Sequence, residues 1–164
     1  MAIRTIIEMG DPALRKVCRP VEKFNERLWT LLDDMAETMI DANGVGLAGP
    51  QVGILRRVVV VWRGEDDIIE MINPEITFFE GEQTGVEGCL SVPGEYGVVT
   101  RPMHVRAKFQ DRYGEWQEVD ETELTARAIC HELDHLQGVL FVDNVSKMLT
   151  EEELEELERR KGDA

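Results

Sequence analysis

One five-residue stretch, His131-Glu132-Leu133-Asp134-His135, constrains this chain more than any other. It reads His-Glu-x-x-His, and residues four apart on a helix lie on the same face, one turn above the other. Two imidazoles placed in this way can bind one metal ion from the same side, while Glu132 reaches the open side of the ion and transfers protons. The helix is predicted by apolar residues at three- and four-residue spacings, namely Leu124, Ala128, Ile129, Leu133 and Leu136. Gly138 is expected to end this helix.

The motif leaves the third ligand of the ion open. A catalytic site of the zinc type needs three protein ligands and one open position. Glu155 lies downstream at the distance used by thermolysin-type endopeptidases, but it belongs to an acidic run, so this match is weak. Cys89 is the upstream candidate. Two core histidines without a metal would show the same spacing, although the chain has only three histidines in all.

Length and charge narrow the class of protein. A chain of 164 residues predicts a single domain over residues 1–164, large enough for a hydrophobic core. The net charge of −15 argues against nucleic acid, DNA included, as a partner. Three cysteines make a disulfide framework improbable and favour a reducing compartment. The chain shows no signal peptide and no apolar run of membrane-spanning length, so we expect a cytoplasmic protein without a membrane partner.

The apolar pattern predicts an α+β fold. Helices are expected over 11–17, 24–42, the metal-binding stretch and 150–161, where Thr150 and Glu153 form a capping box. Strands are expected over 57–63, 68–73, 76–79, 103–110, 115–119 and 141–142. We therefore predict short, largely antiparallel sheets around a central metal-binding helix, with a charged C-terminal helix at the surface.

Two segments do not fit this pattern. Residues 44–53 contain four glycines and Pro50, and we expect no regular element there. The segment is also apolar, which is unlike a linker, so we interpret it as a buried loop that lines a site, with Gln51 as its only polar side chain. Residues 86–94, which contain Cys89, are the second such segment.

Three segments together resemble the signature motifs of the peptide deformylase family: Gly44-Val45-Gly46-Leu47-Ala48-Gly49-Pro50-Gln51, Glu87-Gly88-Cys89-Leu90-Ser91 and His131-Glu132-Leu133-Asp134-His135. The resemblance covers nearly the whole chain and implies a mixed α+β fold. Two positions depart from the family pattern. Gly49 replaces an alanine, and Cys130 replaces a glutamine before the first histidine. We interpret Cys130 as a packing residue, because on a helix it points about 100° away from His131.

The resemblance implies an activity and a set of roles. The activity is removal of the formyl group from N-formylmethionine on new bacterial polypeptides, with release of formate. The implied metal ligands are Cys89, His131 and His135, and the implied ion is Fe(II), which Zn, Ni or Co can replace. Metal-bound water would attack the formyl carbonyl with Glu132 as general acid and base, and the Gln51 amide and Leu90 N–H would donate to the carbonyl oxygen.

Substrate binding is predicted from the same motifs. Gly46 and Gly88 leave backbone exposed, so a peptide could add as a strand between the two segments. The methionine side chain needs an apolar pocket, for which Val45 and Ala128 are the first candidates and Val86 and Tyr96 the next.

The sequence also suggests which residues surround the metal ligands and which partners the protein has. Glu87 and Asp134 are candidates to hold the histidines, and Arg101 could balance Glu87. The expected partners are nascent N-formylmethionyl peptides and a transient contact with the ribosome, for which the acidic C-terminal helix is poorly suited. Two alternatives stay open: an inactive metal- or peptide-binding relative, and a zinc endopeptidase that uses Glu155.

Overall fold

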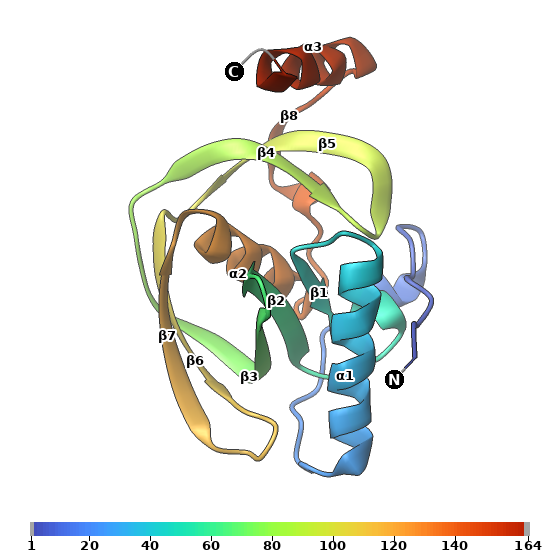
Figure 1. Ribbon diagram of the computed structural model, residues 1–164, viewed down its shortest axis with the longest axis vertical. Coiled ribbons are helices and arrows are strands. Elements are labelled where there is room, and N and C mark those ends of the chain that lie inside the picture. Colours follow the sequence, from blue (N-terminus) through green and yellow to red (C-terminus); the bar gives the residue numbers. More distant parts are fainter. Residues whose placement is uncertain (1, 163–164) are drawn as a thin grey trace.

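Two antiparallel sheets and three α-helices form the computed structural model, which describes residues 2–162 (Figure 1). The helices are α1 (Glu26–Asp41), α2 (Glu123–His135) and α3 (Glu151–Gly162), with 3-10 helices η1 (Pro12–Arg15), η2 (Gly49–Val52) and η3 (Phe141–Asp143). The larger sheet has the order β1 (Gly46–Ala48), β2 (Val58–Gly64), β3 (Asp67–Glu80), β6 (His104–Gln110) and β7 (Trp116–Thr122). The smaller has the order β4 (Gln83–Cys89), β5 (Val92–Arg101) and β8 (Val145–Met148). The predicted α+β class is confirmed.

The larger sheet lies between α1 and α2, as Figure 1 shows for β1 and β2. Successive strand residues point to opposite faces, and both faces are covered here. Val59 and Val61 pack in the apolar cluster that contains α2, whereas Val58 and Val60 pack in the cluster that contains α1. Burial on both sides explains why four consecutive valines are fully buried.

Helix α2 is central, as predicted, and contacts strands β1, β2, β6 and β7. It ends at His135, and the chain then turns at Gly138, which has a φ of +77°. A Cβ atom at Gly138 would lie 2.6 Å from the carbonyl oxygen of Arg15. Glycine is therefore required there both by the backbone dihedral and by close packing.

The segments predicted to be irregular are regular in part. Residues 44–53 contain β1, which pairs with β2, followed by η2. The interpretation as a featureless loop is therefore wrong, although the expected burial is confirmed: all residues from Gly46 to Gln51 are buried. Residues 86–94 belong to β4, a tight turn and β5. Glycines in both strands concealed the strand pattern.

Other boundaries differ from the prediction for local reasons. The strands expected over 68–73 and 76–79 form the single strand β3, because Pro74 lies in an irregular stretch of the pairing with β6, where its missing N–H costs no ladder bond. The helix expected over 11–17 is only the 3-10 helix η1. Residues 141–142 lie in η3 rather than a strand, and the last strand is β8.

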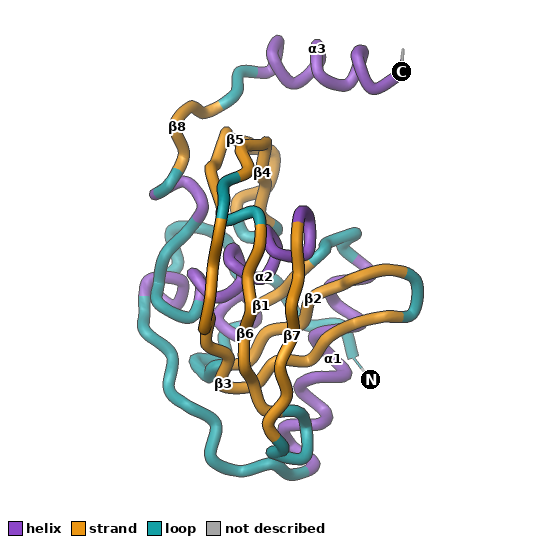
Figure 2. The backbone as a smooth tube through the Cα atoms, turned by 90° about the vertical axis from the view of Figure 1, so that its left-hand side faces the viewer, coloured by secondary structure: helices purple, strands orange, loops and turns teal. Residues whose placement is uncertain are grey.

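Helix α3 stands away from the rest of the molecule in both views (Figures 1 and 2). The predicted capping box is present: the amide of Glu153 donates to Oγ1 of Thr150 at 3.2 Å, and the amide of Thr150 donates to Oε1 of Glu153 at 3.3 Å. No helix within residues 2–162 is long and apolar enough to cross a membrane.

Candidate active site

Three potential metal ligands meet beside the C-terminal half of α2. His131 and His135 lie one turn apart on this helix, and Cys89 is the last residue of β4. One ligand atom from each residue lies within 4.8 Å of the other two, and Sγ of Cys89 is 3.4 Å from Nε2 of His135. Glu155 lies on α3, away from this cluster, so the endopeptidase alternative is wrong (Figure 1).

The three side chains suit a divalent transition metal. A thiolate and two imidazoles are soft and borderline donors, which select such ions over magnesium or calcium. Burial lowers the pKa of His135 to about 3, so its imidazole is neutral and able to bind an ion. Burial also lowers the pKa of His131, but the charge of Glu132 and hydrogen bonds with Cys89 and Glu87 raise it to about 10. A metal ion would therefore displace a proton from His131 as it binds.

Glu132 is fully buried beside the cluster. Its Oε1 atom has no hydrogen-bond partner among the described residues and lies 4.0 Å from Nε2 of His135. Burial raises the pKa of Glu132 to about 7. A carboxyl group with this pKa can both accept and release a proton near neutral pH, which general acid–base catalysis requires.

Gln51 is held with its amide nitrogen toward the cluster. Its Oε1 accepts a hydrogen bond from the amide of Ala48 at 3.0 Å. Its Nε2 donates to Oγ of Ser91 at 3.1 Å and lies 3.6 Å from Sγ of Cys89. The sequence reasoning missed the contribution of Ser91. The available signal was the hydroxyl group of Ser91, which lies inside the otherwise apolar motif around Cys89. The other glycine-rich segment, residues 44–53, offers Gln51 as its single polar side chain, so the two could have been paired.

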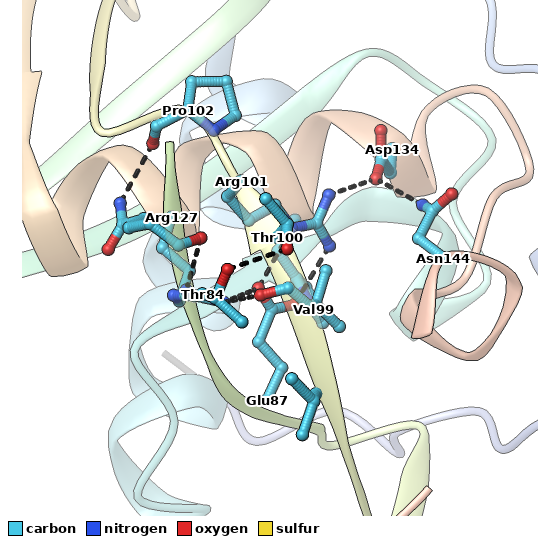
Figure 3. Close-up of polar contacts among 12 residues, drawn as sticks. Thr84, Glu87, Val99, Thr100, Arg101, Pro102, Arg127, Asp134 and Asn144 are labelled. Atoms are coloured by element: carbon cyan, nitrogen blue, oxygen red, sulfur yellow. Dashed lines mark hydrogen bonds and ion pairs between the residues drawn. The ribbon is translucent and has the colours of Figure 1, made fainter. Parts of the chain in front are cut away.

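Glu87 lies in a buried ion-pair network with Arg101 and Arg127 (Figure 3). It also connects this network to His131. Its carboxylate accepts from Nδ1 of His131 at 2.9 Å, from Nη2 of Arg101 at 2.9 Å and from Nη1 of Arg127 at 2.6 Å. Burial raises the pKa of Glu87, but the hydrogen bonds from His131 and Arg101 lower it to about 2. Because an ionised carboxylate can only accept, Nδ1 of His131 carries the proton and Nε2 is left for an ion.

The expected contacts of Glu87 with a histidine and with Arg101 are therefore confirmed. In the described chain, the carboxylate of Asp134 forms no hydrogen bond with the imidazole of His131 or His135. Its carboxylate instead accepts from Nη1 of Arg101 at 2.6 Å (Figure 3). Arg127 was missed, because one arginine on a helix face has no feature in the sequence that distinguishes a buried ion pair from a solvated charge.

A groove of about 550 Å³ leads to the cluster. It is lined by residues of β1, of the β4–β5 hairpin and of α2, and it brings together the residues named from the sequence: Val45, Gly46, Gln51, Gly88, Cys89, Leu90, Ala128, His131 and Glu132. Val86 and Tyr96 line it as well. The structure thus places the expected catalytic and substrate-binding residues around one groove, with His135 beneath it.

The two glycines of the groove are not simply open backbone. A Cβ atom at Gly46 would lie 2.5 Å from Oε2 of Glu132, and one at Gly88 would lie 2.5 Å from the ring of Tyr96. Both glycines are therefore required by side chains that pack against them. The free backbone edges belong to β1 and β4, each of which is the last strand of its sheet.

Known proteins share this arrangement. A sequence model of the polypeptide deformylase family matches residues 3–151. The peptide deformylase of Agathobacter rectalis is 58% identical over 149 residues, which cover 91% of this chain and 94% of the relative. That of Caldanaerobacter subterraneus is 56% identical over 155 residues, which cover 94% and 97%. This chain belongs to the polypeptide deformylase family. It is a metal-binding hydrolase with peptide deformylase activity.

Solved peptide deformylase structures agree with this conclusion. The crystal structure from Thermotoga maritima superposes with a TM-score of 0.86 at 40% identity, covering 89% of this chain and 99% of that one. The Synechococcus elongatus peptide deformylase in complex with actinonin gives a TM-score of 0.82 at 39% identity, covering 96% and 85%.

The two departures from the deformylase motifs have structural explanations. A Cβ atom at Gly49 would lie 2.6 Å from the carbonyl oxygen of Ile54, so the missing methyl group accommodates the chain that follows η2. Cys130 is buried in the apolar cluster with Ala126 and Ile129, and burial raises the pKa of its thiol to about 11. The prediction that Cys130 is a packing residue fits this position.

The N-terminal segment joins the two sides of the site. The amide of Ile7 donates to the carbonyl oxygen of Gln51, and the amide of Met9 donates to the carbonyl oxygen of Ser91, both at 2.7 Å. Gln51 follows β1 of the larger sheet, and Ser91 lies in the turn of the smaller sheet. Residues 7–9 therefore connect the backbone of the segment that contains Gln51 to the backbone of the segment that contains Cys89 and Ser91.

Proposed function

We propose that this deformylase hydrolyses the formyl amide of N-formylmethionine at the start of nascent polypeptides. The observation that carries the proposal is the position of Glu132 and Gln51 next to the Cys89, His131 and His135 cluster, in a groove that opens to solvent. Water is added across the formyl C–N bond, and formate and a free methionyl amine are released. Every motif group is in place, which favours an active enzyme over an inactive relative.

Glu132 is proposed as the proton carrier. It accepts the proton of the attacking water and returns it to the amine nitrogen as the C–N bond breaks, a contribution of about 10²–10⁴ in rate. When bound, a divalent ion supplies Lewis acidity and lowers the pKa of water. We propose Fe(II) as that ion, with Zn, Ni or Co as replacements, because thiolate and imidazole donors suit all four.

Gln51 and Leu90 are proposed to stabilise the carbonyl oxygen of the formyl group. The amide nitrogen of Gln51 is oriented by Ser91, and Leu90 lies directly after Cys89 at the groove. Donors fixed in this way need no reorganisation as negative charge develops, and each typically contributes about 2.7–4 kcal/mol.

The substrate is proposed to bind as an extended strand between β1 and β4. Each strand is at an edge of its sheet, so main-chain groups near Gly46 and Gly88 can pair with a peptide of any sequence. The partly exposed side chain of Val45 and the wall at Ala128 offer an apolar pocket for the methionine side chain. Formylated nascent chains emerge from ribosomes, so we place the enzyme in the bacterial cytoplasm, with a transient ribosome contact.

Formate release from formyl-Met-Ala tests the proposal. The protein is loaded in turn with Fe(II), Ni(II) and Zn(II), and acetyl-Met-Ala serves as the matched control, since one added methyl group tests the size of the formyl site. Because the acetyl peptide would release acetate, the free amine of Met-Ala is measured for both substrates beside formate. We expect it from the formyl peptide and little of it from the acetyl peptide. A protein that holds one ion per chain but releases no formate would overturn the proposal.

A further inference from the structure

A second groove, which shares no lining residue with the deformylase groove, is lined by positive charge. It has a volume of about 930 Å³ and lies between residues 19–25, the start of α1 and the loop at 53–56. Arg4, Arg19, Lys23, Arg27 and Arg56 line it, against the single carboxylate of Glu22. Such a concentration of cations is unexpected in a protein with a net charge of −15.

Most of these cations have no ion-pair partner among the residues that the structure describes. Arg4 binds Asp34, but Arg19, Lys23, Arg27 and Arg56 form no ion pair with any residue in the described range 2–162. Elsewhere, arginines such as Arg63 and Arg112 are paired with two carboxylates each. The groove also has an apolar floor that includes Leu28 and Leu31. It is therefore suited to a ligand that is both acidic and apolar.

Helix α3 has these two properties. Six glutamates lie within 151–158; Glu153 and Glu156 pair with Lys147 and Arg160, and the other four form no ion pair in the described range. Leu154 and Leu157, three residues apart, share one face of the helix. Neither leucine belongs to an apolar cluster of the described chain, and both views show α3 projecting from the body (Figures 1 and 2). A helix of 12 residues is marginally stable by itself in water, so it gains from a partner.

The positions of the helix and the groove exclude docking within one chain. Figure 1 shows α3 at one end of the long axis and the first turn of α1, which borders the groove, toward the opposite end. Only Leu149 and Thr150 connect β8 to α3, so the helix cannot reach that groove. Two copies that lie side by side in opposite directions would instead bring each helix to the groove of the other.

We propose that two copies of this chain pair in this antiparallel way, with α3 of each copy bound in the basic groove of its partner. The glutamates face Arg19, Lys23, Arg27 and Arg56, and the leucines cover the apolar floor. A long polyanion such as RNA matches the groove less well. It would not bury the apolar floor, and the negative charge of the rest of the protein would repel it.

The test uses charge reversal in full-length protein, with light scattering and analytical ultracentrifugation at concentrations up to about 100 µM. The groove variant carries Arg27→Glu and Arg56→Glu. The helix variant carries Glu151→Lys and Glu158→Lys, which flank the face that contains Leu154 and Leu157. The matched control carries Lys16→Glu and Lys108→Glu, which change the net charge as much as the groove variant but lie outside the groove.

We expect wild type and control to form dimers at about 50 mM salt and to dissociate at about 0.5 M. Each of the groove and helix variants alone should weaken dimerisation at least about tenfold. An equimolar mixture of the two should form dimers again, because each reversed helix then meets a reversed groove. All variants should keep deformylase activity on short peptides.

Several results would overturn the proposal. These are a wild type that stays monomeric at low salt, a dimer that survives deletion of residues 150–164, or a mixture of the reversed variants that fails to associate. If instead the groove variant loses affinity for a single-stranded RNA without any change in oligomeric state, the groove is an RNA site, and the second copy is excluded as its occupant.

Discussion

The backbone of Gly46 lies against the carboxylate of Glu132, so closely that a Cβ atom at residue 46 would be 2.5 Å from Oε2. Gly46 belongs to β1 and Glu132 to α2, and these elements pack directly against each other. The position of the Glu132 carboxylate, the proposed proton carrier, is thus limited by strand β1, which belongs to a different sequence motif. A glycine that the sequence suggests for peptide binding also makes room for the carboxylate of Glu132.

Gly46→Ala should reduce turnover while leaving the metal in place. The added methyl group displaces the Glu132 carboxylate, and a misplacement of about 1 Å can cost about 10² in rate. Overpacking should also lower the free energy of unfolding by about 1–3 kcal/mol. Steady-state kinetics, metal analysis and urea unfolding would measure the three quantities. Unchanged kcat in the variant would show that Glu132 can move without loss.

Glu132→Gln should keep the ion and lose about 10²–10⁴ in kcat. Glutamine has nearly the same shape as glutamate but cannot accept the proton of water. Metal content per chain and formate release would be measured on the same preparation. Turnover within a few-fold of wild type would contradict the assignment of Glu132 as proton carrier.

Gln51→Ala should lower kcat by about 10²–10³, because its amide acts mainly in the transition state. Ser91→Ala is the related test, since it removes the acceptor that orients Nε2 of Gln51. We expect the same direction and a smaller effect. If Gln51→Ala changed KM alone, Gln51 would be a residue that only binds substrate.

Arg101→Met should lower the free energy of unfolding by about 3–5 kcal/mol. The change leaves the buried carboxylate of Glu87 with one arginine fewer and also removes the partner of Asp134. The matched control is Arg106→Met, because Arg106 forms an exposed ion pair with Asp120. This change should lower the free energy of unfolding by less than about 1 kcal/mol. Equal effects for the two variants would show that the Glu87 network contributes no more than a surface ion pair.

Cys89 should make the Fe(II) form sensitive to air. A thiolate ligand beside an open coordination position is exposed to dioxygen, and its oxidation removes the ion. Burial raises the pKa values of Cys18 and Cys130 to about 11, so these thiols stay protonated and unreactive. Activity against time in air would be compared for the Fe(II) and Ni(II) forms, with mass spectrometry of the three cysteine peptides. Equal lifetimes, or oxidation first at Cys130, would contradict this prediction.

The sequence predicts most of the site and less of the fold. The His-Glu-x-x-His spacing depends only on helix geometry, so His131, Glu132 and His135 could be placed without tertiary information. The strands that carry Gly46 and Gly88 could not, because their glycines are required by Glu132 and Tyr96, residues distant in the sequence. Likewise, Ser91 and Arg127 acquire their roles only when Gln51 and Glu87 are brought beside them.

The substrate groove has walls that belong to two different sheets. No strand of the sheet that contains β1 pairs with a strand of the sheet that contains β4 in the described chain. The separation of the walls is therefore set by side chains, by the residues that hold the ion and by the two backbone bonds from Ile7 and Met9. A bulky residue after the methionine of the proposed substrate could therefore spread the walls without breaking a single strand pair. Tolerance of varied nascent chains would then be a property of how the groove is assembled.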